Sequence, residues 1–450
     1  MSLVDDYFGI SSSLSTWQRE VRAGLTTFLT MSYILLVNPA ILGVAIKTPN
    51  AAAELLFATA AASAFGCLAM GLIARYPFAT APGMGLNAYF AYTVVLTLHI
   101  PWQIALGAVF VEGLIFMALS WGGIRTALLD GIPRNIKHAT TAGIGLFLSL
   151  IGLKNAGLVA SHPVTYVTLG HLAAPSSWLC LLGLAVTSVL LVRRVPGAIL
   201  VGIAGTTGLA LVAHLAVFPA VDGTMQPFPG LNGPPLQSPV WPVHLLGALD
   251  IRGALGRGAL LVVFTFLFVE VFDTAGTLIG LAEKAGYVDA EGRLPRSNQA
   301  FFADALATTL GAFLGTSTTT AYIESAAGIE EGGRTGLTAV VVGLLFAVSV
   351  FAWPLAAAVP PAATAPALIL VGAMMTTHLG LIEWHKMDEA IASFLTMIAM
   401  PFTYSIANGI GFGLLTFVVL KALGGKAREL HPVTWLLGVL LVLRYTYLNE

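Results

Sequence analysis

Long runs of apolar residues, separated by short polar or Gly/Pro-rich connections, follow one another along almost the whole chain. A helix needs about 20 apolar residues to cross the hydrocarbon core of a bilayer. The runs number fourteen, and we expect each to be a membrane span. They lie at residues 22–46, 51–74, 78–98, 102–121, 136–153, 176–193, 197–218, 257–282, 298–314, 318–331, 335–354, 364–382, 388–404 and 407–423.

Three segments depart from this simple pattern. The third and tenth runs, 78–98 and 318–331, are too polar and too rich in glycine for plain lipid-facing helices. We expect both to be broken near mid-membrane, with a short extended segment leading into a half-helix. A final run, 431–448, is interpreted as an interfacial helix rather than a fifteenth crossing.

Composition agrees with an all-α polytopic membrane protein. Of the 450 residues, 57% are hydrophobic and 10% are charged, with a mean hydropathy of +0.87, whereas about 25% of residues are charged in soluble domains. The 21 Lys and Arg residues are balanced by 22 Asp and Glu residues, which leaves no basic surface for nucleic acid. Cys67 and Cys180 lie within apolar runs, so we expect buried thiols, no disulfide and no cysteine metal site. The polar first twenty residues predict no cleavable signal peptide.

Basic residues are distributed asymmetrically among the connections. With the N-terminus inside, sixteen fall on the inner side and four on the outer side. Because Lys and Arg of short loops concentrate on the cytoplasmic side, we expect a plasma (inner) membrane protein with both termini in the cytoplasm. The inner set is Arg19, Arg22, Arg75, Arg125, Arg134, Lys137, Arg193, Arg194, Lys284, Arg293, Arg296, Arg334, Lys386, Lys421, Lys426 and Arg428; the outer set is Lys47, Lys154, Arg252 and Arg257.

The longest connection, 219–256, separates two halves of seven spans each. Two seven-span halves in series must have opposite orientations in the membrane, as in the inverted repeats of many secondary transporters. An offset of 237 residues aligns 27–43 with 264–280 and superposes Asn87 on Glu324. Identities are few, and a chance match between membrane helices is the alternative.

Ionisable side chains within a span are candidates for function, because each costs about 2.5–3.5 kcal/mol to insert. Glu270 and Asp273 are spaced i, i+3 and therefore share one helix face. Asp273 is expected to face a cavity, with a carboxylate satisfied by backbone N–H groups as the alternative. For Glu112 a structural or gating hydrogen bond is the expectation. The acids well inside spans are Glu112, Glu270, Asp273 and Glu324, while Glu54 and His138 lie nearer span ends.

The segment GTSTTTAYIESAAG at 315–328 has five consecutive hydroxyl residues and no long apolar run. Extended backbone leading into a half-helix would place N–H groups and the positive end of the helix dipole at mid-membrane. Glu324 would then lie in the first turn of that helix, with Tyr322 just before it. A helix N-cap explains one hydroxyl but not five.

The counterpart in the first half is YPFATAPGMGLNAYF at 76–90. Its proline and glycines, Gly85 among them, break the crossing after Phe78 and Thr80. Asn87 supplies both a hydrogen-bond donor and an acceptor, although a lone buried Asn often makes only a helix–helix hydrogen bond. The two broken segments together predict a pocket that suits a flat, neutral, polar ring, since carboxylates accept ring N–H groups and aromatic faces stack on bases.

At these motifs the chain resembles the adenine/guanine/hypoxanthine permeases, the Azg-like branch of the nucleobase-ascorbate transporter superfamily. The matching segments are GLTTFLTMSYILLVNPAILG, FATAPGMGLNAYFAYTVV, FVEVFDTAGTLIG, SNQAFFADALATTLGAFLGTSTTTAYIESAAGIEEGGRTGLTAV and FLTMIAMPFTYSIANGIGFG. The resemblance implies fourteen spans in two inverted repeats, a core domain, and a gate domain through which such proteins often form homodimers. The implied divisions are a cytoplasmic segment (1–21), core domain (22–121 and 257–354), gate domain (136–218 and 364–423), external loop (219–256) and C-terminal tail (424–450).

The resemblance also implies uptake of a purine nucleobase coupled to a cation, usually a proton, with no other cofactor and no metal. The candidates for proton coupling are the buried acids Asp273, Glu270 and Glu324. The histidine that follows the eighth-span acid in uracil permeases is Thr274 here, so its role is not carried over. The implied substrate-binding residues are Asp273, Glu324, Asn87, Gly85, Phe78 and Tyr322, and the broken third span adds Thr80 as a further candidate.

The expected mechanism is elevator-like alternating access, in which protonation of a core carboxylate lowers the cost of moving the site. Three rival functions are an anion exchanger of the same fold, a nucleobase channel and a membrane-embedded magnesium enzyme. Anion exchangers of this fold usually carry a soluble domain after the last span, where barely thirty residues follow Leu423 here. Paired Asp-x-x-x-Asp motifs for a diphosphate–metal site are missing from the sequence, so we expect a transporter and not an enzyme.

Overall fold

The computed structural model describes residues 3–120, 133–219, 224–228, 230, 234–256, 258–289 and 294–447. Within these residues nine helical segments are long and apolar enough to cross a membrane, which makes the chain a multi-pass membrane protein. They are Trp17–Leu42, Ala51–Ala74, Trp102–Leu119, Arg134–Asn155, Pro175–Val192, Leu260–Ala285, Gly336–Ala356, Pro361–Leu381 and Ile406–Leu423. Ala198–Val212 is apolar but shorter. The total of fourteen spans and their inverted repeat stay predictions, and Arg125, Arg257 and Arg293 lie outside the described residues.

The first half begins with helices that break and resume where polar residues or prolines occur. Thr16 caps α2 by accepting a hydrogen bond from the Arg19 backbone N–H. The elements are α1 (Leu3–Phe8), α2 (Trp17–Met31), α3 (Ile34–Leu42), α4 (Ala51–Ala69) with its π-helical continuation η1 (Met70–Ala74), β1 (Thr80–Pro82), α5 (Met84–Ala88), the π-helix η2 (Tyr89–Thr97) and α6 (Trp102–Leu119).

The next segment contains three helices and two pairs of short antiparallel strands. Its elements are α8 (Arg134–Asn155), the paired strands β2 (Val159–His162) and β3 (Tyr166–Leu169), α9 (Pro175–Val192), α10 (Ala198–Val212), and the paired strands β4 (Phe218–Pro219) and β5 (Met225–Gln226).

The second half repeats the alternation of long helices with one extended segment. Its elements are α11 (Ile251–Ala254), α12 (Leu260–Ala285), α13 (Ser297–Leu314), β6 (Thr319–Ala321), α14 (Ser325–Glu330), α15 (Gly336–Ser349), η3 (Val350–Ala352), α16 (Trp353–Ala357), α17 (Pro361–Met375), η4 (Thr376–Leu381), α18 (Met387–Thr403), α19 (Ile406–Leu423), η5 (Ala427–Glu429) and α20 (Pro432–Tyr447). The predicted run 431–448 is therefore helical over Pro432–Tyr447, and its interfacial position stays a prediction.

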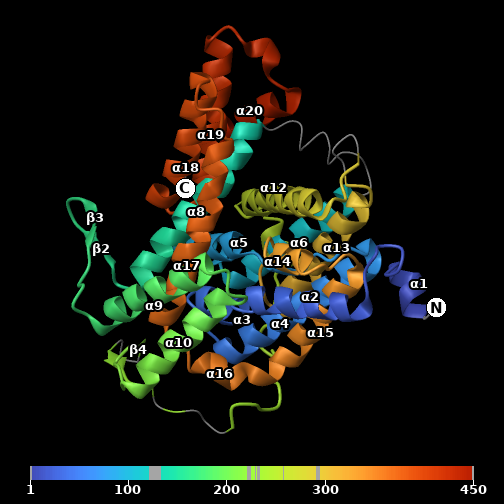
Figure 1. The fold of residues 1–450 in the computed structure, drawn as a ribbon. Helices are drawn as coiled ribbons and strands as arrows, with labels where there is room; N and C mark the ends of the chain where they lie inside the picture. The colour runs from blue at the N-terminus through green and yellow to red at the C-terminus, as the bar shows by residue number, and fades with distance from the viewer. Residues whose placement is uncertain are drawn as a thin grey trace.

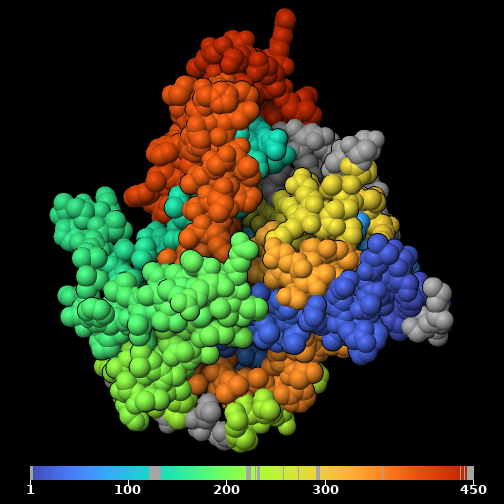
Figure 2. Space-filling view, viewed as in Figure 1, coloured from blue at the N-terminus to red at the C-terminus, as the bar shows by residue number. Residues whose placement is uncertain are grey.

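The helices pack as two groups, each built from both halves of the chain (Figure 1). In one group α4 packs against α13 and α15, α6 against α12 and α13, and α2 against α14 and α15. In the other group α8 packs against α17 and α18, α19 against α18 and α20, and α9 against α10 and α17. Figure 2 shows the orange and red surface of the second group projecting beyond the rest of the molecule.

Small residues allow very close approach of helices in the first group. A Cβ atom placed on Gly71 of η1 would lie 2.5 Å from the carbonyl oxygen of Gly336, at the start of α15. Small residues at such crossings let helix backbones touch, which is how membrane helices gain packing energy without a hydrophobic driving force.

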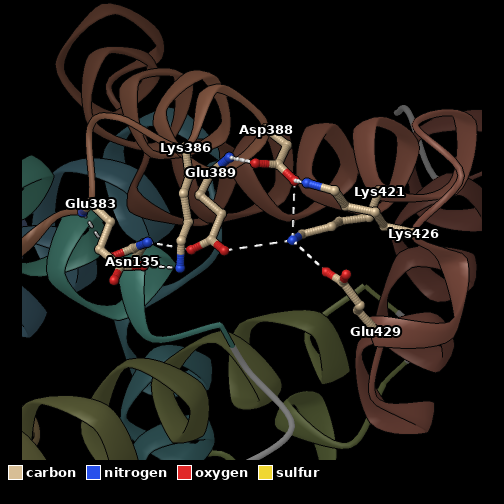
Figure 3. Close-up of polar contacts among 8 residues, drawn as sticks. All are labelled: Asn135, Glu383, Lys386, Asp388, Glu389, Lys421, Lys426 and Glu429. Atoms are coloured by element: carbon tan, nitrogen blue, oxygen red, sulfur yellow. Dashed lines mark hydrogen bonds and ion pairs between the residues drawn. The ribbon is translucent and has the colours of Figure 1, made fainter.

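A charged cluster ties the second group together at one end (Figure 3). Lys421 of α19 is only 6% exposed, and its Nζ lies 3.1 Å from Asp388 and 3.0 Å from Glu429. Asn135 of α8 donates to Glu389 of α18. These contacts join α8, α18, α19 and η5. Beside them opens a cavity of about 410 Å³, lined by His385, Lys386, Met387, Asp388, Leu420, Gly424 and Lys426.

Candidate functional site

Two extended segments, one from each half of the chain, pair inside the first helix group. β1 and β6 are antiparallel, with Thr80 opposite Ala321 and Pro82 opposite Thr319. All residues of both strands are buried. Each strand is followed by a short helix, α5 or α14, so the structure contains the breaks expected at 78–98 and 318–331.

Side chains complete the hydrogen bonding that so short a sheet leaves open. Pro82 and Thr319 form a non-hydrogen-bonded pair, because the neighbouring Gly83 N–H donates to the Thr318 carbonyl at 2.9 Å, and the Thr319 carbonyl therefore points away from β1. The Thr308 hydroxyl of α13 lies 2.7 Å from that carbonyl oxygen and donates to it. The Ser325 hydroxyl accepts from the backbone N–H of Ala79 at 2.9 Å. The hydroxyl-rich sequence therefore supplies hydrogen-bond partners for backbone groups of the broken spans that have no partner in the sheet.

Glu324 lies immediately before α14, and not within its first turn as the sequence suggested. The reason is a tight turn, in which the Ser325 N–H donates to the Tyr322 carbonyl at 3.1 Å, so that regular helix starts only at Ser325. The Tyr33 hydroxyl donates to Glu324 Oε1 at 2.6 Å. The Tyr322 hydroxyl instead donates to the Pro82 carbonyl, also at 2.6 Å. Tyr33, from the turn between α2 and α3, was not singled out in the sequence.

Asp273 reaches the same region from α12, which contacts both β6 and α14. Its carboxyl group interacts electrostatically with that of Glu324. The adjacent Thr274 hydroxyl donates to Asp304 Oδ2 at 2.5 Å and lies 2.9 Å from the Thr320 hydroxyl. The acids of α12 and of the β6–α14 segment thus converge.

Asn87 is fully buried and binds within the same pair of broken segments. Its Oδ1 accepts from the Ser317 hydroxyl, and its Nδ2 lies 3.4 Å from the Pro82 carbonyl. Asn87 lies inside α5, whereas Glu324 precedes α14. The two residues that the sequence offset superposed therefore do not occupy equivalent positions relative to their helices.

The other predicted site residues face different neighbours. A Cβ atom on Gly85 would lie 2.5 Å from Ile144 of α8, so Gly85 allows the two helix groups to approach each other. The Thr80 hydroxyl lies against Gly66 of α4. The Phe78 ring stacks on Tyr76, with centroids 5.0 Å apart and an interplanar angle of 17°. Phe78 is thus covered by an aromatic neighbour, while Asp273, Glu324, Tyr322 and Asn87 gather around β1 and β6.

A second group of acids lies behind the strands, between α6, α12 and α13. Glu112, Glu270 and Asp304 are all 0% exposed. The ion pairs formed among the described residues include none of the three. Burying an unpaired carboxylate costs several kcal/mol, so these groups are costly unless they are protonated. Asp304 was missed, although an acid within the run 298–314 was a visible signal.

The two ionisable residues nearer span ends make pairs of their own. Glu54 is buried and lies 2.6 Å from Nδ1 of His244 in the connection after α10. His138 Nδ1 lies 3.3 Å from His378 Nδ1, between α8 and η4. Cys67 and Cys180 are free and buried. Across the described residues, no three His, Cys, Asp or Glu side chains are grouped as metal ligands.

Comparison with known proteins gives matches over nearly the full chain. The profile of the permease family matches residues 18–412. A putative permease of Methanocaldococcus jannaschii is 46% identical, covering 100% of this chain and 99% of that protein. The adenine permease AdeP of Escherichia coli is 40% identical (99% and 97% covered), and the guanine/hypoxanthine permease PbuG of Bacillus subtilis is 42% identical (98% and 99% covered).

Solved structures share the fold at low sequence identity. The transmembrane domain of a cyanobacterial bicarbonate transporter, BicA, superposes with a TM-score of 0.61 at 17% identity, covering 87% of this chain and 97% of that one. The murine Solute Carrier 26 family member A9 anion transporter, in an inward-facing state, gives 0.62 at 13% identity, covering 90% and 68%. At these identities the likeness concerns the fold alone.

Proposed function

This chain belongs to the permease family, in the branch of the adenine and guanine/hypoxanthine permeases, and from that premise we propose that it imports purine nucleobases by proton symport. The observation that carries the proposal is the convergence of Asp273 and Glu324 beside the paired strands β1 and β6. It is a transporter and not an enzyme.

The chemistry of these side chains suits a neutral heterocycle. Carboxylates accept hydrogen bonds from the ring and exocyclic N–H groups of a purine, and the Asn87 amide offers a donor and an acceptor. In the proposed site Asp273 and Glu324 bind opposite edges of the base, and Tyr322 supplies an aromatic face. Tyr33 acts by holding the Glu324 carboxylate in position. The nearby acids disfavour an inorganic anion as substrate, because like charges in a desolvated site repel strongly.

Proton coupling follows from the cost of moving unpaired charge through the membrane. A site with ionised carboxylates and no cation would oppose translocation, and a bound proton removes one charge. In the elevator mechanism that we propose, the helix group of 17–119 and 251–357 is the moving core domain. The group of 134–212 and 361–447 is the gate domain, through which two copies associate. Both termini face the cytoplasm in the plasma membrane.

Reconstitution into proteoliposomes tests this function. With an acidic exterior and a neutral interior, labelled adenine, guanine or hypoxanthine is expected to accumulate above its external concentration. A proton ionophore should abolish the accumulation but leave equilibration intact. If none of the three bases binds or enters the vesicles, the proposed function is wrong.

Asp273→Asn tests the assignment of the site within that assay. The substitution keeps the shape of the side chain but removes the group that takes up charge or proton. We expect concentrative uptake to be lost, with the protein still folded by gel filtration. Concentrative, pH-dependent uptake by this variant would show that Asp273 neither binds the base nor contributes to coupling.

A further inference from the structure

The buried acids between α6, α12 and α13 are candidates for the group that holds the coupled proton. Glu112 of α6 and Glu270 of α12 are fully buried on two helices that pack against each other, and their carboxyl groups interact electrostatically. No donor from the described residues reaches either oxygen of Glu112 or Oε2 of Glu270. Two buried carboxyl groups that interact in this way repel each other when both are ionised, so the protonated form of one of them is favoured.

The charged and titratable neighbours of the pair are themselves acidic. Asp304 of α13 and Asp273 of α12 face the pair, and Asp304 in turn accepts from Thr274. Among the described ion pairs, no Lys, Arg or His contacts Glu112, Glu270 or Asp304. Because no cation of the described residues offsets their charge, a proton is the neutralising group that this environment favours.

The pattern of hydrogen-bond donors and acceptors around the Thr308 hydroxyl supports a proton on Glu270. The Thr308 hydroxyl oxygen lies 2.5 Å from Glu270 Oε1 and 2.7 Å from the Thr319 carbonyl oxygen, and it accepts from the Thr319 N–H at 3.1 Å. A hydroxyl has one proton to donate. The Thr319 carbonyl points away from β1 and toward α13, so the Thr308 hydroxyl is the donor that meets it, and the contact with Glu270 is then donated by a protonated carboxyl group.

We propose that Glu270 holds the coupled proton beside the Glu112 carboxylate, and that the Thr308 hydroxyl transmits its presence to β6. The inference rests on the proposed purine–proton symport. With the proton present, Thr308 is free to donate to Thr319 and to hold β6 in its pairing with β1. When the proton leaves, the Glu270 carboxylate competes for the Thr308 hydroxyl, and the Thr319 carbonyl loses its donor. Thr308 is thus a positioning residue that links the proton to the segment bearing Tyr322 and Glu324.

The pH profile of purine uptake in Glu112→Gln tests whether Glu270 holds the coupled proton beside the Glu112 carboxylate. Gln is nearly isosteric but neutral, so it removes the negative charge that strengthens proton binding by Glu270. The midpoint of the pH profile is expected to shift to lower pH by about one unit, a tenfold higher proton concentration, with purine affinity at saturating proton unchanged. A midpoint identical to that of the wild type would overturn the proposal.

Variants at Thr308 test the transmission and do not depend on the folding of Glu112→Gln. Thr308→Val removes the hydroxyl and should weaken the dependence of purine affinity on pH, whereas Thr308→Ser should restore it. Thr309→Val is the matched control, because the Thr309 hydroxyl donates only to Ala305 of its own helix at 2.9 Å. If Thr308→Val and Thr309→Val both show the wild-type pH dependence, the link from Thr308 to β6 is wrong.

The two levels of proposal fail in different ways. Wild-type protein that neither binds nor transports purines overturns the proposed function, and this inference with it. If the wild-type protein shows pH-dependent purine uptake and the variants are indistinguishable from it, only the assignment of the proton to Glu270 and its transmission through Thr308 are overturned.

Discussion

At the scale of single residues, the candidate site is shaped by hydroxyl groups that position acids and backbone. Tyr33 fixes Glu324, Thr308 serves the Thr319 carbonyl, and Ser317 binds Asn87. Hydrogen bonds to charged groups are worth about 1.5–3 kcal/mol, and a buried partner left unsatisfied loses more. The effect of removing one hydroxyl should therefore be large wherever the acid it contacts binds substrate.

Tyr33→Phe should weaken purine binding by about tenfold or more, because it removes one charge-assisted hydrogen bond from Glu324. Binding of labelled purine to the purified protein measures the change. Tyr7→Phe is the matched control, since the exposed Tyr7 hydroxyl donates to the Leu72 carbonyl within η1. Equal affinities in the two variants would show that Glu324 binds no base or needs no positioning.

At the scale of elements, the apolar pattern predicts helix boundaries well and helix interruptions less well. The expected runs 136–153, 176–193 and 388–404 differ from the corresponding helices by one or two residues at each end, because lipid requires uninterrupted backbone hydrogen bonding in a span. The breaks in 78–98 and 318–331 were visible from glycine, proline and threonine content. Their direct pairing was not, since it joins residues about 240 positions apart.

The hydrogen-bond partners of the site acids could not be predicted from the sequence, for a similar physical reason. Asp273 and Glu324 stand out in sequence because charge is rare in a membrane span. Tyr33 and Thr308 do not, because such residues are common in membrane helices and gain their role only from what the fold places opposite them. The superposition of Asn87 on Glu324 failed because a single residue offset ignores differences in loop length between the two halves.

Gly66→Ala tests the importance of the strand pair. Its Cβ would overlap the Thr80 hydroxyl of β1 and lie 2.9 Å from the Ala307 Cβ. Overpacking of this kind costs about 1–3 kcal/mol, so we expect a lower thermal unfolding midpoint and weaker purine binding. Gly205→Ala in α10 is the control, because a Cβ there meets no atom of the described residues within 4 Å. Unchanged stability and purine binding in Gly66→Ala would mean that β1 can shift to make room for the added Cβ, and that close packing of the strand pair is unimportant.

At the scale of the whole molecule, two interleaved helix groups meet where α5 lies against α8 (Figure 1). The group proposed to move carries the buried acids, and the group proposed to stay is held together by the Lys421 cluster (Figure 3). This arrangement separates the part that binds substrate and proton from the part that stabilises the gate.

Lys421→Met should therefore lower stability without changing purine affinity. The substitution removes the cation shared by Asp388 and Glu429 and leaves Asp388 paired with Lys426 alone, at a cost of about 2 kcal/mol. Thermal unfolding in detergent measures the loss. Lys47→Met, which removes an exposed lysine bonded to the Gly43 carbonyl, should leave the midpoint unchanged. A purine affinity that falls with Lys421→Met would contradict the division of roles between the groups.

An experimental structure of the protein with a bound purine tests the central claim most directly. The account predicts density for a flat ring between Asp273 and Glu324, beside Tyr322 and the β1–β6 pair. Density for the base in another place, such as the cavity lined by Lys386 and Lys426, with Asp273 and Glu324 both out of contact, would contradict it.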